Sequence, residues 1–178
     1  MDAPAETVGR LDAHAKPVDL EAVFDAHYSR IARAISRITR DPARAEELAV
    51  EVFLKWSRHP QAHGDHAPGW LYKTGIRLAL DELRRQHRRA RVERLVRFVS
   101  ATPTPEDLQL ARDDRDRVRG VLAALPRRQA ELLLLRHEGL SYEEVAAALG
   151  LNPVSVGTLI VRAQQAFRKE YVKRHGDS

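Results

Sequence analysis

Residues 125–171 decide the fold and read LPRRQAELLLLRHEGLSYEEVAAALGLNPVSVGTLIVRAQQAFRKEY. Their apolar side chains recur every three or four positions, which predicts helices. Gly139 ends the first helix, and Ser141-Tyr142-Glu143-Glu144 has the spacing of a capping box that starts a second one. Gly150-Leu151-Asn152-Pro153 combines a tight turn with the signals that begin a long third helix. This stretch therefore predicts a helix-turn-helix.

A helix-turn-helix suggests binding to duplex DNA. Its first helix braces across the DNA backbone, so the N-terminal turn of its second helix can enter the major groove. An ordinary helical hairpin carries the same local signals, so this stretch alone leaves both interpretations open.

The same helical periodicity extends upstream from about residue 18. A first apolar stripe consists of Leu20, Val23, Phe24, His27, Ile31, Ala34, Ile35 and Ile38. Asp41-Pro42 fits the start of a second helix, whose apolar face runs from Ala45 to Trp56. The stretch from His59 to Pro68 has two prolines and a glycine, which predicts a loop. A third helix is expected from about Pro68 to about Arg91, and the three helices can enclose one small core.

Composition changes between these two helical units. Pro103 and Pro105 lack backbone donors and restrict the residues before them, so a helix does not continue through them. We therefore predict an all-α fold of two small domains joined by a flexible linker. The expected boundaries are a disordered leader at 1–17, a first domain at 18–94, a linker at 95–112 and a second domain at 113–174.

Overall charge points to a polyanionic partner. The 178 residues carry a net charge of +5, with a sequence pI of about 9.9. Nucleic acid is the first candidate for such a surface, although a merely solubilising surface has the same balance. The chain has no cysteine, which excludes disulfides and thiolate metal sites and suits a reducing cytoplasm. No apolar run approaches the roughly 20 residues that cross a bilayer, so we expect no membrane insertion.

Sequence motifs of enzymes are missing. There is no glycine-rich phosphate loop, nucleophile elbow or HExxH motif, so we predict no active site, no cofactor and no enzymatic activity. His59, His63 and His66 with Asp65 resemble a metal site only superficially, because the loop that carries them is not preorganised. We therefore expect no bound metal.

Two stretches of the chain resemble regions of one known protein family, and they occur in the order in which that family has them. The stretch 125–171 strongly resembles the fourth region of sigma-70-family factors. Upstream, VFDAHYSRIARAISRITRDPARAEELAVEVFLKW (23–56) resembles the second region, and GWLYKTGIRLALDELRRQHRR (69–89) resembles its promoter-melting helix. The two-region layout is similar to that of the small extracytoplasmic-function sigma factors. This resemblance implies an RNA polymerase sigma factor that directs transcription initiation.

The resemblance also implies partners and contact residues. The partners would be promoter DNA and core RNA polymerase, through the clamp helices of the largest subunit and the flap of the second-largest subunit, with an anti-sigma factor as a further candidate. Polymerase contact is expected near Glu47, Glu51, Phe53 and Trp56, although the two aromatic rings are also good core candidates. Contact with the minus-ten element is expected from Trp70, Lys73, Arg77, Arg84, Arg85 and Arg88. Contact with the upstream, minus-thirty-five element is expected from Ser141, Tyr142, Pro153, Val154, Ser155, Gly157, Thr158 and Arg162.

This chain departs from the family pattern in both predicted DNA-reading helices. Arg77 stands where the family commonly has an asparagine, and its different hydrogen-bonding fork predicts a different preferred base. The last helix keeps Arg162 but lacks most of the family's other cations. We expect its DNA contact to depend more on shape and apolar contact. Two alternatives therefore stay open: a sigma-like decoy that titrates an anti-sigma factor, and a stand-alone helix-turn-helix regulator.

Overall fold

The computed structural model describes residues 20–100 and 114–176. Within these ranges the chain forms seven α-helices and one short 3-10 helix, with no strand, which confirms the all-α prediction. The elements in chain order are α1 (Leu20–Thr39), α2 (Pro42–Ser57), η1 (Pro60–Ala62), α3 (Ala67–Ser100), α5 (Asp114–Ala124), α6 (Arg127–His137), α7 (Tyr142–Leu149) and α8 (Pro153–His175).

Helix starts follow the capping signals in the sequence. The Asp41 carboxylate accepts a hydrogen bond from the Arg44 backbone N–H at 3.0 Å and begins α2. At α7, the Ser141 hydroxyl accepts from the Glu144 backbone N–H, and the Glu144 carboxylate accepts from the Ser141 backbone N–H. Each such bond satisfies a backbone donor that the helix itself leaves unpaired.

Helices α1, α2 and α3 pack together as a first helical group. Its core includes Ile31 and Ile35 of α1, Trp56 of α2, and Leu71 and Leu80 of α3, all fully buried. Within this group α1 and α3 approach closely at Gly75, where an added Cβ would lie 3.2 Å from the Ile31 side chain.

Helices α5 to α8 form a second helical group around Val121, Leu135, Val145 and Val156. Gly150 ends α7 in the left-handed conformation (φ 63°), which a glycine adopts without steric cost. The axes of α7 and α8 differ by 90° across the turn that follows. This is the geometry expected of a helix-turn-helix.

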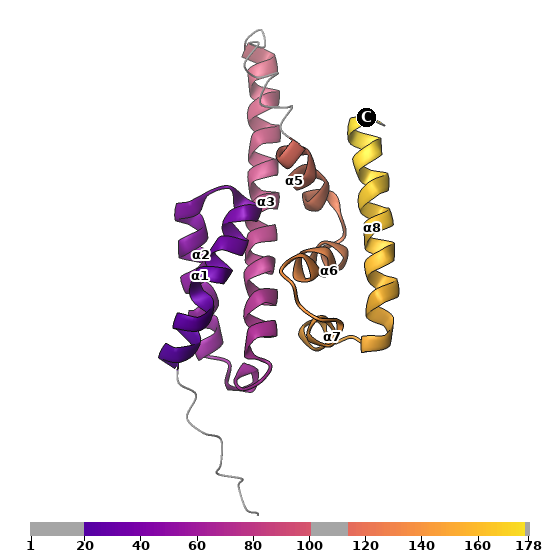
Figure 1. Ribbon diagram of the computed structural model, residues 1–178. Helices are drawn as coiled ribbons and strands as arrows, with labels where there is room; N and C mark the ends of the chain where they lie inside the picture. Colours follow the sequence, from indigo (N-terminus) through magenta and orange to yellow (C-terminus); the bar gives the residue numbers. More distant parts are fainter. Residues whose placement is uncertain (1–19, 101–113, 177–178) are drawn as a thin grey trace, which may run out of the picture.

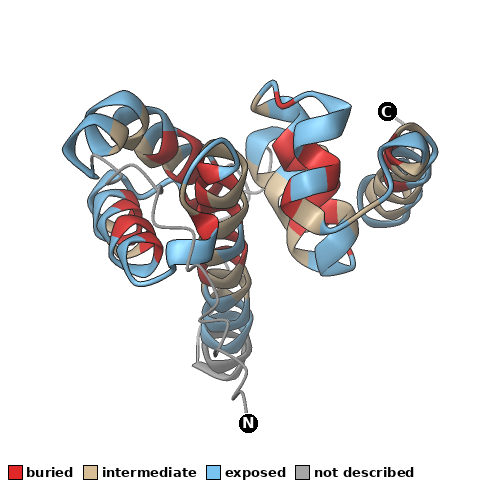
Figure 2. Cartoon of the chain, turned by 90° about the horizontal axis from the view of Figure 1, so that it is seen from below, coloured by how far each residue is buried: buried red, intermediate tan, exposed pale blue. Residues whose placement is uncertain are grey.

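The long helix α3 lies between the two groups, with α1 and α2 on one side and α5, α6 and α7 on the other (Figure 1). Buried residues of both groups belong to one continuous apolar cluster. They gather where helices face one another, whereas residues 91–94 of α3 are exposed (Figure 2). The two predicted units thus pack together through α3.

One predicted boundary is wrong. Helix α3 continues to Ser100, so residues 95–100 are helical and do not belong to the linker expected at 95–112. The residues that follow Arg91 include no glycine or proline before Pro103, so nothing in them ends the helix earlier. The expected leader at 1–17 and the rest of the linker lie outside the described residues.

Across the described ranges, none of the helices taken singly has the length and apolar character that a membrane span requires. Helices α7 and α8 meet that test only as a pair with a sharp bend between them.

Candidate nucleic-acid interface

The N-terminal turn of α8 is open to solvent. Val154 is 89% exposed, and Pro153, Thr158 and Arg162 are also exposed, while Ser155 is partly buried. Asn152 caps this end, because its side-chain oxygen accepts the Val154 backbone N–H at 3.0 Å. The inward side of α8 carries the buried Val156, which holds the helix on its neighbours. Most side chains predicted for upstream-element contact therefore share one accessible end.

Tyr142 lies beside this end of α8. Its exposed ring stacks under the Arg136 guanidinium, whose carbon lies 5.3 Å from the ring centroid. An added Cβ at Gly157 would lie 3.4 Å from the Tyr142 ring, at ordinary van der Waals distance. Ser141, the remaining candidate, is exposed and occupied as the N-cap of α7.

Arg77 is joined to the second helical group. Its Nε donates a hydrogen bond to Glu131 Oε1 of α6 at 2.7 Å, and its Nη2 lies 3.4 Å from Glu131 Oε2. The Glu131 side chain is only 3% exposed, so Arg77 compensates a carboxylate that is otherwise buried. The sequence did not indicate this partner, which lies 54 residues further along the chain.

Arg84 is engaged in the same way. Its guanidinium donates to the backbone carbonyls of Ala123, at 3.3 Å, and Leu125, at 3.0 Å. Asp81, one turn earlier on α3, forms an ion pair with Arg127 of α6. Two of the arginines predicted for minus-ten contact thus hold the second helical group against α3.

The other minus-ten candidates are less engaged with the second helical group. Arg85 pairs with Glu82 of its own helix at 2.8 Å, and Arg88 is exposed. Trp70 is partly buried, with its ring 5.6 Å from that of His59. Burial, together with the positive charge of Arg77, holds the pKa of Lys73 below its usual value. These candidates therefore share one helix without forming one continuous free surface.

The acidic side chains predicted for polymerase contact lie on the surface of α2. Glu47 forms an ion pair with Arg44 at 2.6 Å, and Glu51 forms one with Lys55 at 3.1 Å. Such exposed pairs contribute little stability, so a binding partner can displace them at low cost.

Trp56 belongs to the core instead. It is 0% exposed and donates its indole N–H to the Ala62 carbonyl at 3.0 Å. This burial removes Trp56 from the candidates for direct polymerase contact. Phe53 is buried as well, with its ring 4.9 Å from the Phe24 ring.

An exposed apolar patch next to these acids was missed by the sequence interpretation. Leu20 and Phe24 of α1 were expected to face the core but are exposed, as are Val50 and Leu54 of α2. Together with Phe53 they line a shallow groove of about 220 Å³. Val50 and Leu54 are four residues apart, a spacing that was available as a signal for a second, outward apolar stripe on α2.

His63 of the loop before α3 packs against Trp56. His63 Nε2 lies 3.0 Å from the Trp56 carbonyl oxygen, and its ring lies 4.6 Å from the Trp56 ring. Nowhere in the described part of the chain do three or more histidine, aspartate or glutamate side chains come together in a geometry that could hold a metal ion.

Comparison with known proteins agrees with this two-part arrangement. Family models match in two places: "Sigma-70 region 2" over residues 23–89 and "Sigma-70, region 4" over residues 115–166. Among curated relatives, the "ECF RNA polymerase sigma factor SigK" of Mycobacterium tuberculosis is 32% identical over 155 residues, which cover 82% of this chain and 80% of the relative. The chain therefore belongs to the extracytoplasmic-function sigma factors of the sigma-70 family.

Two further relatives extend the comparison. The SigK protein of Mycolicibacterium vanbaalenii is 29% identical over 95% of this chain and 88% of its own length. SigE of Mycolicibacterium smegmatis is 33% identical over 84% of this chain and 60% of its own length. The fold resembles that of the sigma factor RpoE, solved in complex with the anti-sigma factor NepR from Bartonella quintana. This chain and the RpoE chain align with a TM-score of 0.50 and 18% sequence identity, and the alignment covers 85% of this chain and 96% of the RpoE chain.

Proposed function

We propose that this chain binds core RNA polymerase and places it at promoters through two DNA contacts, one by α8 and one by α3. The observation that carries this proposal is the combination, in one chain of this family, of an accessible helix-turn-helix and an acidic, apolar surface on α2. In this role the polymerase supplies the chemistry and the chain itself catalyses nothing. Its place of action is then the bacterial cytoplasm, where transcription occurs.

The proposed polymerase-docking surface consists of Glu47, Glu51, Val50 and Leu54 on α2, with the neighbouring groove. Apolar side chains that are exposed side by side lose water-accessible area when a partner covers them, which favours association. The surrounding acids select a basic partner surface and speed the encounter with it. The clamp helices of the largest subunit are the proposed partner, and the flap of the second-largest subunit is proposed for the second helical group.

The upstream element is proposed to meet the N-terminal turn of α8. Val154 is suited to contact a thymine methyl group, and Ser155 and Thr158 to contact base edges or phosphates. Arg162 supplies positive charge from α8 itself, and the exposed Arg136 adds one beside Tyr142. The proposed contact is therefore weak in electrostatics and rich in shape and apolar contact.

The minus-ten contact requires a rearrangement. Arg77 and Arg84 are bound to Glu131 and to the Ala123 and Leu125 carbonyls, so both guanidinium groups already have protein partners while the two groups are packed, although the Arg77 side chain is 44% exposed. Arg85 and Arg88 remain accessible. We propose that the second helical group leaves α3 when the chain engages polymerase and promoter, which frees Arg77 and Arg84.

An anti-sigma factor is proposed as a second class of partner. Two observations support it: the fold resembles a sigma factor solved with its anti-sigma factor, and this chain packs its two helical groups together. A protein that stabilised this packed arrangement would keep Arg77 and Arg84 away from promoters.

Two other functions remain distinguishable by experiment. A stand-alone regulator would bind duplex DNA but not polymerase, and a decoy would bind an anti-sigma factor without initiating transcription. The family match over both regions disfavours the stand-alone regulator.

The proposal is tested by co-migration of the purified chain with bacterial core polymerase in size-exclusion chromatography. We expect Leu54→Asp to weaken the complex at least tenfold, because it places a charge in the middle of the docking surface. Val92→Asp on α3 is the matched control, since Val92 is 58% and Leu54 51% exposed. A wild-type chain that elutes apart from polymerase, or equal losses in both variants, would contradict the proposed docking.

A further inference from the structure

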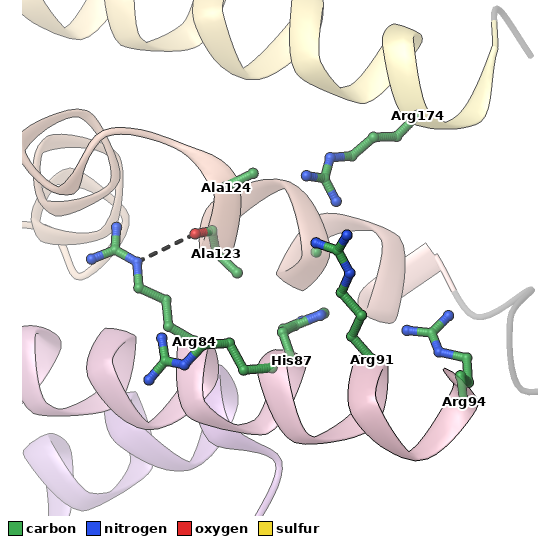
Figure 3. A pocket seen from close by; sticks show the side chains of 9 residues that line it. Arg84, His87, Arg91, Arg94, Ala123, Ala124 and Arg174 are labelled. Carbon is green, nitrogen blue, oxygen red and sulfur yellow. Dashed lines mark hydrogen bonds between the residues drawn. The ribbon is translucent and has the colours of Figure 1, made fainter. Parts of the chain in front are cut away.

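Helices α3, α5 and α8 line an open pocket whose charged side chains are all basic. It has a volume of about 590 Å³. The cationic and imidazole side chains that line it are Arg84, His87, Arg88, Arg91, Arg94 and Arg174, and Gly120, Ala123 and Ala124 form its floor. Figure 3 shows that Arg91 of α3 and Arg174 of α8 point toward one another across it. A volume of this size is in the range of small-molecule sites.

The positive charge of this pocket is poorly balanced. None of the lining residues is acidic. Arg84 donates to backbone carbonyls, Arg94 to the Ala90 carbonyl of its own helix, and Arg174 to Glu170, which lies outside the pocket. Neither Arg88 nor Arg91 forms an ion pair with any residue in the described ranges. Such a cluster repels itself unless an anion enters.

The positive charge around this pocket also acts on His87. It is partly buried beneath the arginines, and its pKa is lowered by burial and by the positive charges of Arg119, Arg174 and Arg94, with Asp116 opposing them. The surrounding positive charge therefore disfavours the protonated imidazole. An anion that neutralised these arginines would raise the pKa of His87.

Guanidinium groups from opposite walls favour one kind of ligand. The planar fork of arginine matches phosphate oxygens in bidentate fashion, and several forks at separate places match several linked phosphates. We propose that this pocket binds a small oligophosphate anion, either inorganic oligophosphate or the phosphate chain of a nucleotide, between Arg88, Arg91 and Arg174.

The site has a consequence for regulation that rests on the proposed function. Its cations come from both α3 and α8, so an oligophosphate bridges the two helical groups and stabilises their packed arrangement. It also occupies Arg88, which is proposed for promoter contact. By linkage, ligand and promoter DNA then oppose each other's binding.

Direct binding tests the site with the full chain alone, without polymerase or promoter. Titration calorimetry at fixed ionic strength measures the affinity for inorganic tripolyphosphate and, separately, for a nucleoside triphosphate. Arg91→Ala/Arg174→Ala should weaken both ligands at least tenfold. The control, Arg89→Ala/Lys173→Ala, removes the same charge from exposed positions of the same two helices outside the pocket, and should change affinity less than twofold. Tighter binding of the nucleotide than of tripolyphosphate would identify a nucleotide as the source.

An independent readout is the titration of His87 by NMR. We expect tripolyphosphate to raise its pKa in the wild-type chain and in the control variant, but not in the pocket variant. Equal weakening in both variants would show diffuse charge attraction and would overturn the site. The site would also be overturned if tripolyphosphate failed to bind while single-stranded DNA bound through Arg91 and Arg174. Neither result bears on polymerase binding, so failure of this site and failure of the proposed function are distinguishable.

Discussion

At the scale of single residues, Gly157 is a weakness in α8. It occupies the fifth position of the helix, where glycine costs about 0.5–1 kcal/mol relative to alanine. An alanine Cβ would meet the Tyr142 ring at an ordinary contact distance. Gly157→Ala should therefore raise the free energy of unfolding by about 0.5–1 kcal/mol, measured by denaturant titration.

The reverse change at an exposed helical position serves as the control for that prediction. Ala147→Gly in α7 should lower the free energy of unfolding by a similar amount. A Gly157→Ala variant that is less stable than the wild type would mean that the Tyr142 ring cannot tolerate the added methyl group.

The predicted site residues differ in how far sequence alone could place them. Glu47, Glu51 and Arg162 lie at the surface, which was predictable because the polar side of an amphipathic helix is visible in its periodicity. The exposure of the apolar Val154 does not follow from that pattern. The role of Arg77 was not visible, because its carboxylate partner is set by tertiary packing. Local sequence spacing does not encode such a contact.

At the scale of elements, the arginines of α3 fall into two sets, those that contact the second helical group and those that do not. Arg77 and Arg84 contact the second helical group, while Arg85 and Arg88 remain open to an added polyanion. Each phosphate contact contributes about 0.9 to the slope of log affinity against log salt for duplex DNA. Arg85→Ala/Arg88→Ala should therefore flatten that slope for promoter DNA by about 2 in filter-binding measurements across salt concentrations.

The control for the slope is a pair of exposed arginines elsewhere in the first helical group. Arg33→Ala/Arg58→Ala removes the same charge and should leave the slope within experimental error. An unchanged slope in the Arg85→Ala/Arg88→Ala variant would assign those side chains to a solvated helix face.

Element boundaries were predictable where a capping residue or a breaker marks them. Asp41, Ser141 and Asn152 each cap the helix that the sequence assigned to them. The end of α3 carries no such mark before Pro103, and the start of the linker was therefore placed too early, at residue 95. The outward apolar stripe of α2 was missed because its inward stripe already satisfied the expected pattern.

At the scale of the whole molecule, the two helical groups share one apolar cluster and several charged contacts. Besides Arg77 with Glu131, these include Arg37 with Glu138 at 2.6 Å. In addition, Arg119 donates to the Ile38 and Thr39 carbonyls at 2.8 and 3.0 Å. Sequence periodicity predicted each group separately, but it held no information on whether the groups pack together.

Weakening one of these contacts should favour DNA binding. Glu131→Gln removes the charge that holds Arg77, so it should raise affinity for minus-ten fork DNA by roughly 5–30-fold, the equivalent of about 1–2 kcal/mol. Fluorescence anisotropy measures this change. Glu170→Gln is the control, because Glu170 pairs with Arg174 within α8 and touches neither α3 nor α6 through that pair. An unchanged affinity in Glu131→Gln would mean that packing of the groups does not limit access to Arg77.

The central claim, that the chain directs transcription, is tested most directly by run-off transcription with purified core polymerase on a pooled genomic template. We expect promoter-specific transcripts that depend on the chain and disappear with Leu54→Asp but persist with the same chain carrying Ala147→Gly. No promoter-specific transcript, despite a chain that co-migrates with polymerase, would contradict the claim.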